Sequence, residues 1–264
     1  MATLIGDDKL FLSRSQEGEA QILLADGEDV LIGDALLIFQ TAQGGDDTLE
    51  STGNTNVLLG DAVVMAGSAS GGEDSLTATG DTNVLVGDAG LMNGSALGGN
   101  DTLNAIGNAN ILVGDGYEMY NTSRGGDDIL FSTGSNTIWG DAFAMYDSAV
   151  GGDDVLIAGG GINILYGDAV EMNDGAVGGA DTFVLQTDAP GAVPGNVVIL
   201  DFDRTEGDTL GLYQELFDAL GSTPEDFRFL VIQGATQIIY QSDLLAAVNG
   251  VTDITAADFS LFAG

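Results

Sequence analysis

The chain has 264 residues, 44% of them hydrophobic, which is enough to build a substantial core in one or two domains. Its 41 acidic and five basic residues give a formal charge of -36, so we expect a cation partner and no nucleic acid partner, because phosphates need a lysine and arginine surface. The absence of cysteine and histidine excludes disulfides, thiolate metal sites and histidine-dependent hydrolase centres, and we expect no enzymatic activity.

Residues 1–24 read as an N-terminal cap or a degenerate first coil. The opening residues "MATLIGDDKLFLSRS" lack a basic segment followed by a long apolar run, so they do not resemble a Sec signal peptide. No apolar stretch of 18 residues occurs in the sequence, and we therefore expect no membrane insertion.

Residues 25–186 form a repeat with a period of 27 residues and one step of 26. Apolar runs of a few residues alternate with Gly, Asn, Asp and Ser, which indicates short strands joined by turns. The sequence therefore predicts an all-β fold, a right-handed parallel β-solenoid of 27-residue coils with a small C-terminal capping region. Coils of one and a half turns per repeat would stack Asp47 on Met65 and Met65 on Asn83, so one coil per repeat is preferred.

Stacked coils place residues 27 apart about 4.8 Å from each other, and this spacing predicts three apolar columns. We interpret the methionine column as core packing rather than a metal site. The columns are Leu49, Leu76, Leu103, Leu130, Leu156 and Phe183; Leu31, Leu58, Leu85, Leu112, Ile138 and Leu165; and Ile38, Met65, Met92, Met119, Met145 and Met172.

Gly-Gly-x-Asp segments recur in every repeat and would stack their carboxylates. Stacked carboxylates repel each other unless a cation separates them, and Ca²⁺ takes its oxygen ligands from carboxylates and backbone carbonyls. We expect the paired glycines to adopt the positive φ angles that would aim carbonyls at the ion. The alternative is a turn that the aspartate caps through its own backbone. The predicted ligands are Gly45 and Asp47, Gly72 and Asp74, Gly99 and Asp101, Gly126 and Asp128, Gly152 and Asp154, and Gly179 and Asp181.

Two further polar columns accompany these segments. Asn56, Asn83, Asn110, Asn136 and Asn163 predict a hydrogen-bonded amide ladder rather than a calcium row. The Gly-Asp column has two interpretations of equal weight: a second calcium row, or aspartates that hydrogen-bond turn amides. Its members are Asp34, Asp61, Asp88, Asp115, Asp141 and Asp168.

The segments "SGGEDSLTA", "LGGNDTLNA", "RGGDDILFS" and "VGGDDVLIA" resemble the nonapeptide of the RTX (repeats-in-toxin) calcium-binding β-roll family. Gly72, Asp74 and Leu76 match the fourth, sixth and eighth positions, whereas Ala69 and Ser70 replace the first two glycines. The resemblance covers roughly residues 25–264 and implies several bound Ca²⁺ ions held by the aspartates of the Gly-Gly-x-Asp segments.

Residues 187–264 resemble the C-terminal cap of RTX proteins, including the stretch from Asp201 to Asp208, with an amphipathic helix expected over 212–221. The resemblance implies type I secretion and an extracellular location, which includes association with the cell surface. We expect a non-enzymatic protein that folds on binding Ca²⁺ and contributes to a surface layer, matrix, adhesive or filamentous assembly, with self-association through coil edges. The alternative is the calcium module of a secreted RTX hydrolase or toxin.

Overall fold

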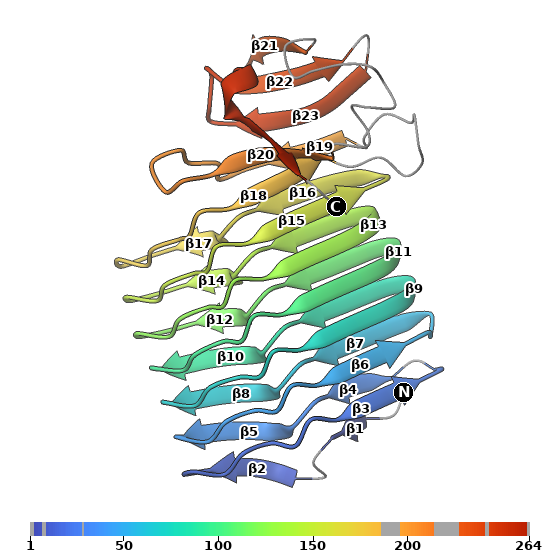
Figure 1. Ribbon diagram of the computed structural model, residues 1–264, viewed down its shortest axis with the longest axis vertical. Coiled ribbons are helices and arrows are strands. Elements are labelled where there is room, and N and C mark those ends of the chain that lie inside the picture. Colours follow the sequence, from blue (N-terminus) through green and yellow to red (C-terminus); the bar gives the residue numbers. More distant parts are fainter. Residues whose placement is uncertain are drawn as a thin grey trace.

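The computed structural model is a parallel β-solenoid, and it describes residues 3–6, 9–27, 29–185, 196–213, 227–240 and 243–262 (Figure 1). The described residues contain no α-helix and one short 3₁₀ helix, η2 (Ala256–Asp258). Neighbouring strands pair residues 27 or 26 positions apart, as in Leu49 with Leu76 and Leu76 with Leu103. One repeat is therefore one coil, as predicted, and the interpretation with one and a half turns is wrong.

Each coil has two arms. In the first arm, two strand segments face each other across a bend and belong to a 17-stranded sheet. In the middle coils, one long strand makes both segments, and elsewhere two shorter strands make them. These strands are β1 (Thr3–Ile5), β3 (Ile22–Ala25), β4 (Val30–Ile32), β6 (Thr48–Ser51), β7 (Thr55–Leu59), β9 (Ser75–Val86), β11 (Thr102–Val113), β13 (Ile129–Trp139), β15 (Val155–Gly159) and β16 (Ile162–Tyr166).

In the second arm, a seven-stranded parallel sheet faces a wall made by a row of single β-bridges, such as Gln43 with Ser70 and Ser70 with Leu97. The sheet lies to the left of the larger one in Figure 1. Its strands are β2 (Lys9–Ser13), β5 (Ala35–Gln40), β8 (Ala62–Gly67), β10 (Ala89–Gly94), β12 (Gly116–Met119), β14 (Ala142–Met145) and β17 (Ala169–Met172).

Each arm has its own hydrophobic core. The two predicted leucine-rich columns fill the first arm, and the methionine column packs with stacked alanines in the second. The register confirms all three columns. Met172 is the exception to burial, with 36% of its side chain exposed, because β17 is the last strand of its sheet.

The two arms meet at two corners. The Gly-Asp corner joins β7 to β8 and the equivalent strands of the other coils, and the Gly-Gly-x-Asp corner leads back into the first arm. Trp139 on β13 packs against Phe143 on β14, with ring centroids 5.3 Å apart, in a third and smaller apolar cluster that is separate from the cores of the two arms. The outer faces of the two arms therefore converge at the Gly-Asp corner, which is the inner side of the bend.

The C-terminal residues extend the first arm beyond the last complete coil, at the top of Figure 1. β18 (Thr182–Leu185), β20 (Thr209–Tyr213) and β24 (Phe259–Phe262) stack in parallel on β15. β19 (Asn196–Ile199) and β23 (Asp243–Asn249) stack on β16, and an antiparallel meander continues through β22 (Ala235–Tyr240) and β21 (Arg228–Ile232). Of the helix expected over 212–221, Leu212 and Tyr213 lie in β20, and residues 214–221 lie outside the described residues.

Candidate functional site

Both predicted aspartate series are buried at the junction between the two cores. Asp74, Asp101 and Asp128 are 1–3% exposed, and Asp61, Asp88 and Asp115 are fully buried. The mutual effects of these groups on their pKa values, such as that of Asp74 on Asp61, indicate that the two series lie close together. The interior of the solenoid therefore carries a double column of carboxylates between two apolar cores.

The Gly-Gly-x-Asp carboxylates link one coil to the next. The backbone N–H of Asp74 donates to Oδ1 of Asp101 at 2.7 Å, and the N–H of Asp101 donates in the same way to Asp128. The same bond recurs from Asp47 to Asp74, from Asp128 to Asp154 and from Asp154 to Asp181. These carboxylates accept from the preceding coil, so a cap on the aspartate's own turn does not describe these bonds.

The Gly-Asp carboxylates bridge the junction within one coil. Each accepts a hydrogen bond from the second glycine of the Gly-Gly pair 11 residues later, as in Gly99 N–H to Asp88 Oδ1 at 2.9 Å and Gly126 N–H to Asp115 Oδ1 at 2.6 Å. The equivalent bonds join Gly45 to Asp34, Gly72 to Asp61, Gly152 to Asp141 and Gly179 to Asp168. Both corners of a coil are thus fixed to each other.

The expectation of positive φ angles at the paired glycines is wrong. None of the glycines in the Gly-Gly-x-Asp segments has a positive φ; that conformation occurs at the far end of the second arm, as at Gly67, Gly94 and Asn121, and in the bend of the first arm, as at Gly134. The pairs are glycine because of close approach. A Cβ on Gly99 would lie 1.5 Å from the carbonyl oxygen of Gly72 in the preceding coil, and a Cβ on Gly98 would lie 2.2 Å from Asp115 Oδ1 and 2.4 Å from Asp88 Oδ2.

Burial makes ionisation of these carboxylates costly. Desolvation raises the pKa of Asp88 well above its usual value, and the neighbouring Asp101, Asp61 and Asp115 raise it further. The pKa values of the other central members of both columns are raised for the same two reasons. At the C-terminal end, burial raises the pKa of Asp168 to about 7. The pKa of Asp181 is raised to about 10 by burial and by the nearby charges of Asp168 and Asp141.

Eight carboxylates of this double column each have an oxygen that takes part in no hydrogen bond. One carboxylate oxygen has no partner and almost no solvent contact in each of Asp74, Asp88, Asp101, Asp115, Asp128, Asp141, Asp154 and Asp181. Buried polar atoms in native proteins are nearly always paired, and an unpaired carboxylate oxygen is among the most costly. The column therefore needs either protons or cations to complete it.

A hard cation fits the oxygens at the junction, where carboxylates lie beside backbone carbonyls, as Asp74 Oδ2 and the carbonyl of Gly87 do around Gly60. The space beside the first glycine is bounded by two successive Gly-Asp carboxylates at Gly44, Gly71, Gly98 and Gly125, and no side chain larger than hydrogen fits there. Within the described part of the chain, however, no three acidic side chains converge in a ready metal-binding group. Cation binding would require the carboxylates to move from the positions that the hydrogen bonds give them.

Two residues of the C-terminal region continue the columns. Asp208 accepts from the backbone N–H of Asp181 at 3.0 Å, as Asp181 does from Asp154. Asp201 accepts from the N–H groups of Gly167 and Asp168. The repeat period predicts the place of Asp208, which lies 27 residues after Asp181. It does not predict the place of Asp201, because in this last coil the chain returns to the first arm without forming a second arm.

The asparagine column is the predicted amide ladder. Nδ2 of Asn83 donates to Oδ1 of Asn110 at 2.7 Å, and Nδ2 of Asn110 donates to Oδ1 of Asn136 at 2.7 Å. The bonds continue from Asn56 to Asn83 and from Asn136 to Asn163. This prediction is confirmed, and the ladder is a structural element of the first arm.

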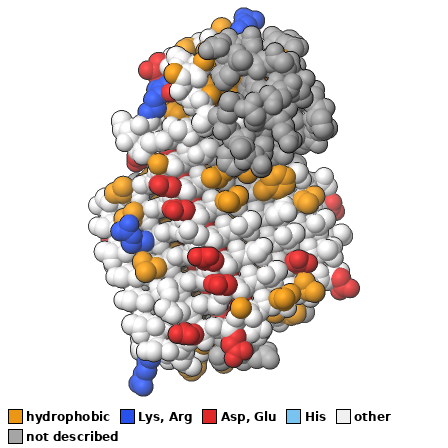
Figure 2. Space-filling model, viewed as in Figure 1, with side chains coloured by type: hydrophobic (Ala, Val, Ile, Leu, Met, Phe, Trp, Pro, Cys, Tyr) orange, Lys and Arg blue, Asp and Glu red, His pale blue; other side chains and the backbone are white. Residues whose placement is uncertain are grey.

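The acidic residues that precede the Gly-Gly-x-Asp aspartates are exposed, in contrast to the buried column. Oδ1 of Asp46 accepts from the N–H of Glu73, and Oδ1 of Asp127 accepts from the N–H of Asp153. Acidic side chains form a row along the face that Figure 2 shows. This row is separate from the double column and faces solvent.

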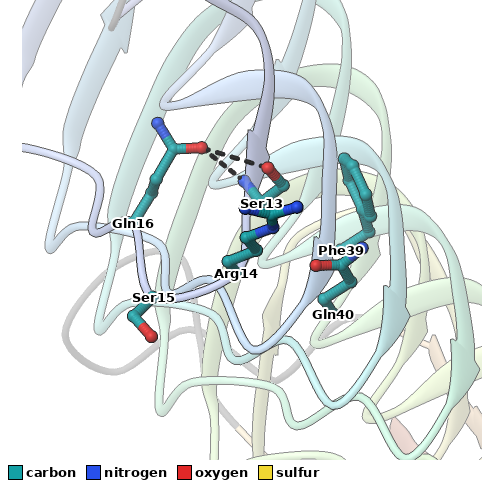
Figure 3. Close-up of a pocket in the computed structure, with 6 residues that line it drawn as sticks. All are labelled: Ser13, Arg14, Ser15, Gln16, Phe39 and Gln40. Atoms are coloured by element: carbon teal, nitrogen blue, oxygen red, sulfur yellow. Dashed lines mark hydrogen bonds between the residues drawn. The ribbon is translucent and has the colours of Figure 1, made fainter.

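A surface hollow lies at the N-terminal end of the second arm, lined by Ser13, Arg14, Ser15, Gln16, Phe39 and Gln40 (Figure 3). Ser13 donates to Oε1 of Gln16 through both its backbone N–H and its hydroxyl. None of the predicted ligands lines this hollow, and its neutral side chains and single guanidinium offer no carboxylate for a cation.

No helix among the described residues is long and apolar enough to cross a membrane. Comparison with known proteins gives no match: no protein family model matches the sequence, and no curated protein matches it. The functional assignment therefore depends on the geometry of the junction and on the resemblance of the repeats.

Proposed function

We propose that this protein is a secreted, non-enzymatic structural β-solenoid that binds several Ca²⁺ ions along its double aspartate column and folds as it binds them. The observation that carries the proposal is the set of buried carboxylate oxygens without partners in both columns. The resemblance of the Gly-Gly-x-Asp segments to RTX repeats supports calcium as the cation.

Burial of the carboxylates would couple the binding of ions to the folding of the chain. In an extended chain, each carboxylate is hydrated and ionised near pH 7, whereas the fold buries them in two adjacent columns. Divalent cations would compensate that charge in the folded state only, so their binding free energy adds to the free energy of folding. In a compartment with little free calcium the chain would stay extended, and it would fold outside, where calcium is more concentrated.

Asp34, Asp61, Asp88, Asp115, Asp141 and Asp168 would hold the ions together with Asp47, Asp74, Asp101, Asp128, Asp154 and Asp181. Asp208, and Asp201 beside it, would complete the last positions. The bound ions would supply positive charge between carboxylates. The N–H groups of the second glycines hold the Gly-Asp carboxylates before binding, and ions would draw these carboxylates towards the space beside the first glycines.

Calcium titration into chelated protein, followed by far-UV circular dichroism, tests the proposal. We expect a transition from coil to β-structure with calcium and a much weaker response to magnesium, which keeps its waters and prefers octahedral sites. A parallel series in chelator at falling pH separates protons from cations. A complete β signal in chelator at neutral pH, unchanged by calcium, would refute the proposal.

Light scattering recorded during the same titration tests the structural role. Particle growth that accompanies the transition would support a surface layer, matrix, adhesive or filamentous assembly. A calcium-folded protein that stays monomeric at all concentrations would remove the assembly part of the proposal and leave calcium-coupled folding in place.

A further inference from the structure

An uncharged strip runs along the outside of the solenoid on the inner side of the bend. Three columns make up this apolar strip: one from Val30 to Ile164, one from Ile32 to Tyr166, and one from Leu36 to Val170. No Asp, Glu, Lys or Arg occupies any position of these columns, although the chain carries 46 charged residues, the sum of 41 acidic and five basic. The strip is therefore an uncharged part of a strongly acidic repeat.

The strip combines ordered packing with exposed apolar area. Val113 is fully buried although it lies on the outer face of β11, and Tyr117 stacks on Phe143 with centroids 5.2 Å apart and planes 8° apart. At the same time Val63 is 41% exposed, Ile111 37% and Tyr117 42%. Rigid aromatic rings surrounded by exposed aliphatic side chains are typical of protein interfaces, and contiguous patches of this kind are uncommon on monomers.

End-to-end stacking of copies would not use this strip. β18 stacks on β15 and β19 stacks on β16, so a following copy would not pair with β15 or β16 directly.

We infer that the apolar strip binds the same strip of a second copy, in a side-by-side dimer with two-fold symmetry. A second copy is the occupant that charge favours, because two strongly acidic chains can approach closely only where both lack carboxylates. Six coils at about 4.8 Å give a strip about 30 Å long. Its middle column is already buried from Ile32 to Trp139, so the contact would be made by the two outer columns, where Val63, Ile111 and Tyr117 are exposed.

This inference deepens the assembly part of the proposed function, but it does not require calcium to be the cation. The full chain, folded under conditions that far-UV circular dichroism has verified, is examined by sedimentation equilibrium over a range of concentrations. We expect a monomer–dimer equilibrium, seen as an apparent mass that rises with protein concentration.

The test variant is Val63→Glu with Ile111→Glu, which places two carboxylates in the strip. Its control is Thr77→Glu with Thr102→Glu, which adds the same charge to the outer face of the first arm, where Glu50 already stands in the column of Thr77. We expect dimerisation to weaken at least about tenfold in the test variant and to stay unchanged in the control. If the test variant does not fold, Val63→Ser with Ile111→Ser removes the same contacts without charge.

The outcomes separate this inference from the calcium proposal. A wild-type protein that folds with calcium and stays monomeric, or a folded test variant that dimerises as the wild type does, overturns the dimer. A dimer that forms without any response to calcium supports the strip and contradicts the calcium proposal. Binding of the monomeric wild type, but not of the test variant, to phosphatidylcholine vesicles would assign the strip to a lipid surface and overturn the dimer.

Discussion

The second glycine of each Gly-Gly pair sets how closely two coils can approach, and Gly99→Ala tests this directly. The new Cβ would lie 1.5 Å from the carbonyl oxygen of Gly72, and real Cβ contacts are not closer than 3.0 Å, so the two coils must separate locally by about 1.5 Å (3.0 - 1.5). That movement breaks the bonds nearest the corner: Gly71 N–H to Leu97 O, Thr102 N–H to Asp74 O, and Asp74 N–H to Asp101 Oδ1, at 2.7–2.8 Å.

Three inter-coil hydrogen bonds at about 1 kcal/mol each give an expected loss of about 3 kcal/mol in the free energy of unfolding. The assay is urea denaturation in excess calcium at neutral pH, followed by far-UV circular dichroism. The matched control is Gly90→Ala, whose Cβ meets only the carbonyl oxygen of Val63 at 3.0 Å and points outward, where other coils carry valine or tyrosine. Equal midpoints for the two variants would show that the close approach is not what requires glycine.

Three further predictions concern the junction and the ladder. Gly98→Ala fills the space between the Asp88 and Asp115 carboxylates, so we expect calorimetry to show fewer or weaker calcium sites than in Gly90→Ala, and identical isotherms would contradict a site there. Asn110→Ala leaves the ladder amides on either side each short of a buried partner, and we expect a loss of about 3 kcal/mol in urea denaturation, whereas a loss under about 1 kcal/mol would mean that the ladder contributes little. In chelator, the pKa values of Asp208 and Asp201, raised by burial to about 6 and about 7, mean that the folded state holds protons that the unfolded state releases above about pH 4. Stability should therefore fall as pH rises towards about 7, by about 1.4 kcal/mol per pH unit for each retained proton, and thermal melts that stay level over this range would refute the reasoning.

The repeat period determined much of this protein in advance. Residues 27 apart become neighbours in any parallel solenoid with one coil per repeat, so the three apolar columns and the asparagine ladder could be read from the sequence. The same reasoning places Asp74 above Asp47 and Asp88 above Asp61. These predictions of stacked residues need only the translation from one coil to the next along the solenoid axis.

The arrangement within one coil was decided by the tertiary structure. Asp61 and Gly72 are 11 residues apart, and only the angle between the two arms brings that carboxylate to that N–H. The same angle turns Trp139 towards Phe143 on the outer face. Corner angles depend on packing between residues of different columns, about which a period carries no information.

The glycine pairs show the limit most clearly. Their sequence pattern allows either a left-handed turn or a close approach of two backbones, and both need a residue without a side chain. Only the coordinates place Gly99 against the carbonyl of Gly72 and assign the positive φ angles to Gly94 and its equivalents instead. The sequence alone determined which residues stack, and the tertiary structure decided which of them face each other across a coil, because that depends on how two cores pack around one junction.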